Sequence, residues 1–202
     1  EGQENRRIFE ETAEMWSEQL AEEAAVISRY RYRYLKQAEG EIRTCFAEMT
    51  GEKEIPSVRY DGSSRQEPEE YEDEKRTAEV YRNLLTAHWD RELGAGTTLY
   101  GIHKDDIEIL LNGMSARAYA SQGQQRSLAL AMKLAEGEVC RAVCGEKPVF
   151  LFDDVFSELD AGRRAYLSSR IHDRQVIITT CEPFGKAAGK TIAVEKGQYR
   201  EI

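Results

Sequence analysis

The chain lacks the long apolar segments that place a protein in a membrane. No run approaches the roughly 18 apolar residues needed to span a bilayer, and no signal peptide is visible. Positive charge is also in deficit, because 37 acidic residues outnumber 28 Lys and Arg and give a formal net charge of −9. A nucleic-acid binder that works by bulk positive charge is thereby excluded, whereas a local basic face is not. We expect a cytoplasmic protein with no membrane segment.

Cysteine is scarce, and its spacing does not suit a metal site. The four cysteines are Cys45, Cys140, Cys144 and Cys181, and none forms a C-x-x-C pair. Cys140 and Cys144 lie one helical turn apart, but nearby His or Cys partners for a metal are missing. Buried, reduced thiols of a cytosolic protein are therefore the better interpretation.

The excess of negative charge is confined to the first half of the chain. Residues 1–96 hold 14 basic and 23 acidic side chains, whereas residues 97–202 hold 14 of each. Apolar residues recur at helical spacing through residues 1–49 and again over residues 68–93, with a possible strand at residues 55–60 between them. We predict that residues 1–96 form an antiparallel helical arm, which packs along one stripe and leaves its other faces charged.

Arginine and tyrosine alternate strictly from Arg29 to Tyr34. The alternation is compatible with a strand or with a basic, aromatic surface for nucleic acid. Tyr30 and Tyr34 continue the apolar stripe of their neighbours, which favours a helix. Its arginine face is either solvated or in contact with DNA, and the candidate contacts are Arg29, Arg31, Arg33 and Lys36.

The segment Gly94-Ala95-Gly96 marks the predicted domain boundary, because the apolar period changes from helical to two-fold beyond it. Residues 97–100 are predicted to form a strand, and residues 107–111 to form a second. The Asn112-Gly113 pair predicts a two-residue hairpin turn, with a strand returning over residues 114–119. Residues 97–202 thus form a second predicted domain.

Further along, the pattern predicts a parallel βαβ unit. A helix over residues 124–144 precedes an apolar strand at residues 149–153, and Asp160 is a plausible N-cap for the next helix. A β-branched run at residues 176–180 gives the second, buried parallel strand. Residues 191–195 and 198–202 are expected to form a final hairpin.

Two short segments carry the chemistry. Ser121-Gln122-Gly123-Gln124 offers a hydroxyl, backbone amides and a helix N-terminus, which together favour a phosphate group. Asp153 and Asp154 follow a strand, where one carboxylate can hold Mg²⁺ through water and its neighbour can polarise an attacking water. Each segment alone is also explained by capping. Their joint order and spacing favour a nucleotide site.

The whole set resembles the signature, Walker B and D-loop of ABC-type ATPases. The sequences of these motifs resemble those of the RecF family of DNA repair proteins, specifically over residues 97–182 and more loosely over the arm. SMC- and RecN-like heads share the architecture but not these motif sequences. The segments that carry the resemblance are Gly101-Ile102-His103-Lys104-Asp105-Asp106, the Asn112-Gly113 hairpin, Ala120-Ser121-Gln122-Gly123-Gln124-Gln125-Arg126 and Phe152-Asp153-Asp154-Val155-Phe156-Ser157-Glu158-Leu159-Asp160.

The resemblance implies the C-terminal α/β half of an ABC ATPase head: a mixed or parallel sheet with flanking helices and hairpins, joined to the helical arm. It also implies that the signature residues contact the γ-phosphate of ATP on the opposite subunit. These residues are Ser121, Gly123 and Gln124.

The remaining site residues follow the same resemblance. Asp153 serves Mg²⁺ through water, and Asp154 stands where many ABC proteins have a catalytic Glu. Ser157 and Asp160 lie in the D-loop at the dimer seam, and Thr180 marks the switch position.

Function follows from the family. The resemblance implies an ATP-dependent homodimer that clamps DNA at single-strand gaps, with RecO and RecR as partners in recombinational repair and the SOS response. Two departures are notable. Ile102 and Lys104 stand where the family often has Pro and Arg, and no His occupies the switch position near Thr180, which suggests slow hydrolysis.

A P-loop of the form G-x-x-x-x-G-K-[ST] is missing. The segment Gly185-Lys186-Ala187-Ala188-Gly189-Lys190-Thr191 is one residue short, and a strand pattern rather than a helix follows it. The chain also begins at Glu1 without Met. We therefore expect part of a longer protein, which is inactive as an ATPase on its own.

Two other functions remain open. One is a structural module for DNA or protein interaction, in which the acids and the Ser-Gly turn are scaffolding. The other is an SMC- or RecN-like head, which would need a much longer coiled coil than residues 1–96 provide.

Overall fold

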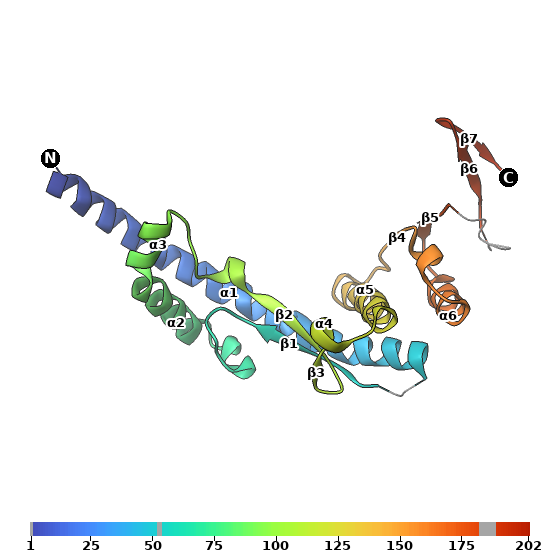
Figure 1. Cartoon of the computed structure of the whole chain (residues 1–202), viewed down its shortest axis with the longest axis horizontal. Helices are drawn as coiled ribbons and strands as arrows, with labels where there is room; N and C mark the ends of the chain where they lie inside the picture. The colour runs from blue at the N-terminus through green and yellow to red at the C-terminus, as the bar shows by residue number, and fades with distance from the viewer. Residues whose placement is uncertain (1, 52–53, 182–188) are drawn as a thin grey trace.

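A single long helix supports the whole chain. The computed structural model describes residues 2–51, 54–181 and 189–202, and α1 (Gly2–Thr50) runs through most of its length. Figure 1 shows α2 and α3 against one part of α1, and α5 and α6 against the other. No helix among the described residues is long and apolar enough to cross a membrane.

The prediction of a helix over residues 1–49 is confirmed, but the stripe that it buries was partly wrong. Tyr32 is buried, whereas Tyr30 is 71% exposed and Tyr34 is 38% exposed. Ala25, Ser28 and Tyr32 follow one another at helical spacing on the buried face. The Arg-Tyr alternation does not indicate which tyrosine is buried, since the exposed Tyr30 and Tyr34 lie two residues to either side of the buried Tyr32.

The second helical segment is broken where one helix was predicted. It divides into η1 (Pro68–Glu72), α2 (Glu74–Ala87) and α3 (Trp89–Ala95). Asp73 separates η1 from α2. Its carboxylate caps the N-terminus of α2 by accepting a hydrogen bond from the amide of Arg76. Salt bridges from Arg82 to Glu18 and from Arg29 to Glu74 show that α2 runs antiparallel to α1.

A three-stranded antiparallel sheet joins the two halves of the sequence. β2 (Asp106–Leu111) pairs along its whole length with β1 (Pro56–Asp61) and briefly with β3 (Met114–Ser115). The predicted Asn112-Gly113 turn is confirmed by positive φ angles of 52° and 78°. Two strand predictions were wrong: residues 97–100 form a loop, and the returning strand gives way after two residues to α4 (Ala116–Tyr119).

The largest core lies across the predicted boundary at residue 96. Ile42, Cys45 and Phe46 of α1 pack in one cluster with Leu128 and Leu134 of α5 (Gln122–Cys144). Sheet pairing between β1 and β2 crosses the same boundary. The division into two domains stays a prediction, and the two sides share a core and a sheet.

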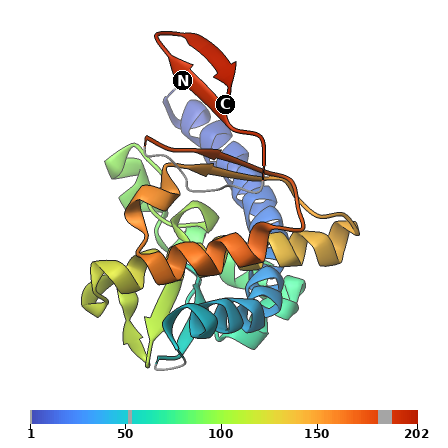
Figure 2. The same cartoon turned by 90° about the vertical axis from the view of Figure 1, so that its right-hand side faces the viewer.

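The predicted parallel βαβ unit is confirmed. β4 (Phe150–Asp153) pairs in parallel with β5 (Val176–Thr179), and η3 (Val155–Glu158) and α6 (Ala161–Ile171) connect them. Figure 2 shows the two strands side by side near the C-terminal end. Burial on both faces was predicted wrongly, because Leu151 is 72% exposed and Ile177 is 54% exposed, whereas Phe150 and Phe152 face the core.

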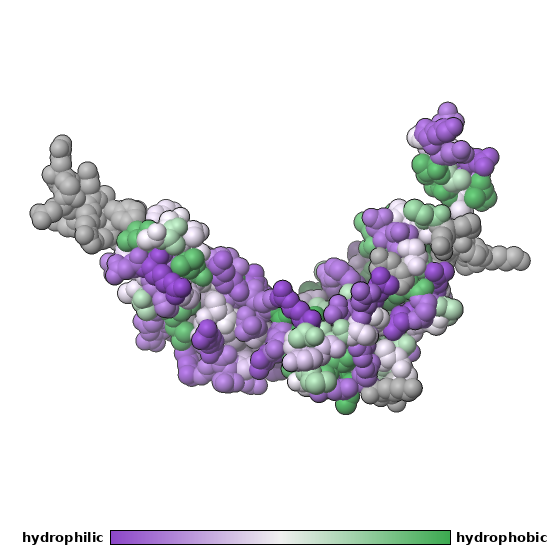
Figure 3. All heavy atoms as spheres, in the orientation of Figure 1, coloured by the Kyte–Doolittle hydropathy of each residue, from purple (hydrophilic) through white to green (hydrophobic). Residues whose placement is uncertain are grey.

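The final hairpin is also confirmed. β6 (Ile192–Glu195) and β7 (Gln198–Glu201) pair around Lys196 and Gly197, both with positive φ. The hairpin projects from the rest of the chain, and apolar surface gathers on it in the space-filling view (Figure 3). The P-loop-like segment lies largely outside the described residues.

A buried carboxylate fastens the loop before β2 to the rest of the fold. The Asp105 side chain is fully buried and accepts hydrogen bonds from the hydroxyls of Tyr60 and Tyr81 and from the amide of Ser63. Burial, reinforced by the negative charge of Asp105, raises the pKa of Tyr81 to about 12. The fold therefore favours the neutral phenol.

This preference predicts a loss of stability in alkali. The stabilisation is fully present below the pKa of about 10 of an unfolded tyrosine, and it falls as pH rises towards 12. We expect the free energy of unfolding, measured with urea between pH 8 and 11, to decline above pH 10. Tyr81→Phe should start lower at pH 8, because one hydrogen bond to a buried charge is lost, and then decline less. An equal decline in both proteins would contradict the assignment.

Candidate functional site

The signature segment forms the capped N-terminus of α5. Ser121 is the N-cap, and its hydroxyl accepts from the amide of Gln124 at 3.3 Å. The Gln124 side chain accepts in return from the amide of Ser121 at 2.6 Å, which completes a capping box. Of the first amides of this helix, those of Gln122 and Gly123 have no hydrogen-bond partner in the part of the chain that the structure describes. These two amides remain available to an anion.

Gly123 is not required by the packing of the chain. A Cβ built there would meet only the Arg163 guanidinium, at 3.6 Å, which is ordinary contact. Glycine within a helix costs about 0.5–1 kcal/mol relative to alanine. The fold therefore carries a less stable residue here without needing its small size. Close approach of a ligand to the helix end would explain it.

Arg163 joins this helix end to the D-loop. Its Nε donates to the Ser127 hydroxyl at 2.7 Å, and that hydroxyl donates to the Gly123 carbonyl at 2.9 Å. The Arg163 guanidinium also forms an ion pair with Asp160. Ser127 is completely buried. A continuous set of polar contacts thus runs from Gly123 to Asp160.

Asp160 begins α6, as the sequence predicts. Its carboxylate accepts from the amide of Arg163 at 2.9 Å. This backbone hydrogen bond, with the positive charge of the same residue, holds the pKa of Asp160 below its usual range. The ionised carboxylate therefore both caps α6 and positions Arg163.

The paired acids lie at the carboxyl end of β4. The Thr179 hydroxyl, on the neighbouring strand β5, donates to the Asp153 carboxylate. Asp154 has a φ of 50°, an unfavourable conformation for a residue with a side chain, and its amide donates to the Thr179 carbonyl at 3.0 Å. Backbone strain of this kind is common at functional sites. Thr179 therefore fixes both acids.

Ser157 continues this arrangement into the D-loop. Its hydroxyl donates to the Asp154 carbonyl at 2.7 Å, which holds the turn of η3. The predicted site residues thus fall into two groups, each held together by its own polar contacts. One lies around Gly123 and Asp160, and the other around Asp153, Asp154 and Ser157. Within the described ranges, no hydrogen bond or ion pair joins Ser121 or Gln124 directly to the paired acids.

Three contributors were missed by the sequence reasoning. Arg163 and Ser127 link the two helix ends, and Thr179 contacts Asp153. The spacing offered a partial signal, because Arg163 is three residues after an N-cap and Thr179 ends the strand parallel to β4. The contact between Arg163 and Ser127 depends on tertiary packing and had no local signal.

The basic residues singled out in α1 lie on the helical arm. Arg29 pairs with Glu74, and Arg33 pairs with Glu72 at 2.7 Å. Arg31 donates to the Ile102 carbonyl at 3.0 Å, and the Lys36 ammonium lies 5.6 Å from the centre of the Tyr32 ring. Their role in DNA contact stays a prediction.

The residues fit part of a nucleotide site. In the described part of the chain, no group of three or more His, Cys, Asp or Glu side chains could hold a metal ion by itself. A single carboxylate such as Asp153 suits Mg²⁺ that is otherwise held by water and phosphate oxygens. Free amides at the start of α5 suit a phosphate. The chain therefore provides anion contacts and one carboxylate, but no P-loop.

A capped helix N-terminus beside a parallel strand that ends in two carboxylates, followed by a turn and a second capped helix, is the arrangement expected for the signature, Walker B and D-loop elements of an ABC-type ATPase. Comparison with family models gave no match. Curated relatives give a more specific answer. The chain is 38% identical over 168 residues to "DNA replication and repair protein RecF" of Staphylococcus carnosus (strain TM300), which covers 83% of this chain and 45% of the relative. The protein of the same name from Staphylococcus aureus (strain JH9) is 38% identical over 174 residues, with the same coverage.

Solved structures agree with these relatives. The structure described as "the recombination mediator protein RecF-ATPrS in RecFOR pathway" has a TM-score of 0.83 and 31% identity, and it covers 96% of this chain and 51% of that one. The RecF-ATP structure from the same pathway has a TM-score of 0.81 and 31% identity. The chain therefore matches the C-terminal part of RecF proteins, as the sequence indicated. It spans about half the length of the relatives it matches.

The capping box predicts different effects for two substitutions at Ser121. Ser121→Ala removes the N-cap acceptor and should lower the free energy of unfolding by about 1 kcal/mol. Ser121→Asp keeps an acceptor at the helix N-terminus and should leave stability nearly unchanged. Urea unfolding followed by circular dichroism measures both values. Equal destabilisation by the two variants would show that Ser121 does not act as a cap.

Proposed function

We propose that this chain supplies the part of an ABC-type ATP site that acts on the opposite subunit. Ser121, Gly123 and Gln124 contact the γ-phosphate of ATP held by the partner's P-loop, so ATP closes a homodimer. Gly123 carries this proposal, because the fold has room for a Cβ there and still has glycine. The two free amides beside it point to the same chemistry.

The paired acids serve the nucleotide bound by their own subunit. Asp153 holds Mg²⁺ through water, in a rotamer that the Thr179 hydroxyl fixes. Asp154 orients and polarises the attacking water from its strained position at the strand end. When bound, Mg²⁺ neutralises charge that develops on the phosphate oxygens.

Nucleotide contact requires one rearrangement at the helix end. The Gln124 side chain donates to the Glu54 carboxylate and accepts from the Ser121 amide. A phosphate that approaches Gln124 meets the negative charge of Glu54, so we expect Glu54 to move away from this amide. The absence of a histidine at Thr180 favours slow hydrolysis, which suits a protein that uses ATP chiefly to hold a dimer closed.

The complete protein is proposed to bind DNA in recombinational repair. The family name and the RecFOR description of the matching structures support this role. The closed dimer clamps DNA at single-strand gaps in the cytoplasm and works with RecO- and RecR-like partners to load recombinase. Of the basic candidates, Lys36 is better placed for DNA than Arg29, Arg31 and Arg33, because each of the three arginines pairs with an acidic side chain.

Dimerisation of the full-length protein tests the proposal. Gly123→Asp places a carboxylate where phosphate is expected and should abolish the ATP-induced dimer in sedimentation velocity. Gly40→Asp is the matched control, because Gly40 lies in the interior of α1 with open space around it and should leave dimerisation intact.

The chain alone should show no micromolar binding of Mg²⁺-ATP in calorimetry, since it has no P-loop. Retention of the ATP-induced dimer by Gly123→Asp would favour the alternative that these residues are scaffolding of an interaction module. Micromolar binding by the chain alone would contradict the split site.

A further inference from the structure

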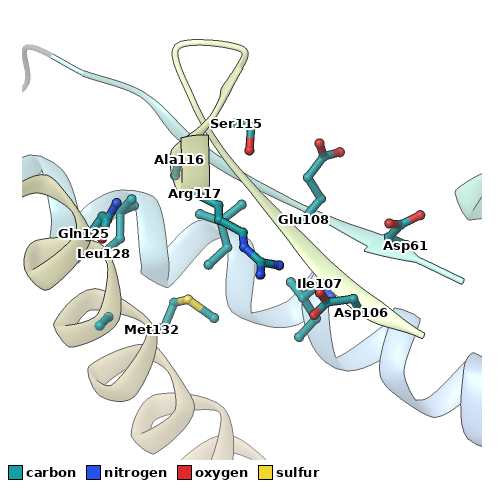
Figure 4. A pocket seen from close by; sticks show the side chains of 12 residues that line it. Asp61, Asp106, Ile107, Glu108, Ser115, Ala116, Arg117, Gln125, Leu128 and Met132 are labelled. Atoms are coloured by element: carbon teal, nitrogen blue, oxygen red, sulfur yellow. The ribbon is translucent and has the colours of Figure 1, made fainter. Parts of the chain in front are cut away.

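An open groove of about 530 Å³ runs between β2 and α5, away from the paired acids. One wall is formed by residues 106–109 of β2, and the other by Gln125, Leu128, Ala129 and Met132 of α5. Figure 4 shows Arg117 extending into the space between these walls. None of these groove residues belongs to the proposed nucleotide contacts.

The β2 wall is an unpaired sheet edge. β1 pairs with β2 over all six residues, but β3 pairs only with Leu110 and Leu111. The edge that faces the groove is therefore open from Asp106 to Ile109. The amide of Ile107 is satisfied locally, because it donates to the Asp106 carboxylate at 2.8 Å. An edge strand beside a groove is the geometry that an added peptide strand uses.

The groove has an apolar floor. Ile107, Ile109, Leu128 and Met132 line it, and Ile109 and Met132 pack against the main core. The Glu108 side chain alternates with those of Ile107 and Ile109 along β2 and pairs with Arg59 across the ladder. A strand added to this edge would place alternate side chains on the apolar floor and in solvent.

Charge at the two ends of the groove selects the occupant. Arg117 makes no hydrogen bond or ion pair with any residue that the structure describes, and it follows β3 directly. At the far end, Asp61 and Asp106 stand opposite each other in the β1–β2 register, an unfavourable pairing of like charges. A carboxylate near Arg117 and a cation near the two acids would complement both ends.

We propose that this groove binds an extended peptide segment of a partner protein, which adds to β2 as a fourth strand. The segment has apolar side chains at alternate positions, an acidic residue at the Arg117 end and a basic residue at the Asp61–Asp106 end. Main-chain hydrogen bonds supply affinity, and the apolar floor and charged ends supply specificity. This inference is independent of the proposed ATP contacts.

A synthetic peptide tests the proposal directly. The probe is fluorescein-labelled Lys-Val-Thr-Val-Thr-Glu, and fluorescence anisotropy reports its binding to the protein. We expect saturable binding that N-methylation of the peptide backbone abolishes, because a methylated amide cannot donate to the strand edge. Arg117→Glu should weaken binding at least about tenfold and prefer a probe that ends in Lys. Arg200→Glu, on the distant β6–β7 hairpin, is the control for net charge.

A second pair of variants separates edge pairing from folding. Ile107→Pro places a proline ring on the open edge, which should block the added strand and abolish binding, whereas Ile107→Thr leaves the edge unobstructed and should retain most of the binding. Circular dichroism checks that both variants fold. No saturable binding up to 1 mM probe, or binding unaffected by N-methylation and Ile107→Pro, would overturn the proposal. Self-association of the protein that Ile107→Pro abolishes would assign the groove to a second copy and equally overturn it.

Discussion

The hydrogen bond from Arg163 to Ser127 is the contact on which the site geometry depends. It ties the N-terminus of α6 to the second turn of α5, and through Ser127 it reaches the Gly123 carbonyl in the first turn. Because Asp160 holds the same guanidinium, the signature and the D-loop cannot move independently without breaking a charged hydrogen bond. The hydrogen bond and the ion pair of Arg163 thus join the two motifs into one surface.

That surface is positioned by packing rather than by its own interactions. α5 lies between the second half of α1 and the βαβ unit, and Gly137 lets it approach the Phe150 ring, where a Cβ would clash. The same helix α1 carries α2 at its other end through Ala21, Ala24 and Tyr81. Movement of the arm is therefore linked to the signature through one continuous helix of 49 residues. The buried Asp105 side chain joins β1, α2 and the loop before β2 near the middle of α1.

Sequence reasoning captured the elements whose signals are local. The Ser121 and Asp160 caps, the Asn112-Gly113 turn and the β-branched strand before Thr180 each follow from short-range chemistry, and each is found. It failed where tertiary contacts decide. Tyr32 rather than Tyr30 is buried because Tyr60 and Tyr71 pack beside it, and residues 116–119 turn into a helix instead of extending the sheet. Arg163, Ser127 and the open edge of β2 had no local signature, because each depends on partners far along the chain.

The central claim is that Ser127 and Arg163 hold the two motif-bearing helix ends together. A double-mutant cycle with Ser127→Ala, Arg163→Met and the combined variant measures this directly by equilibrium unfolding. We expect a coupling free energy of about 1–3 kcal/mol, because the Ser127 hydroxyl is buried and the Arg163 guanidinium is charged. Additive effects of the two substitutions, with coupling indistinguishable from zero, would contradict it.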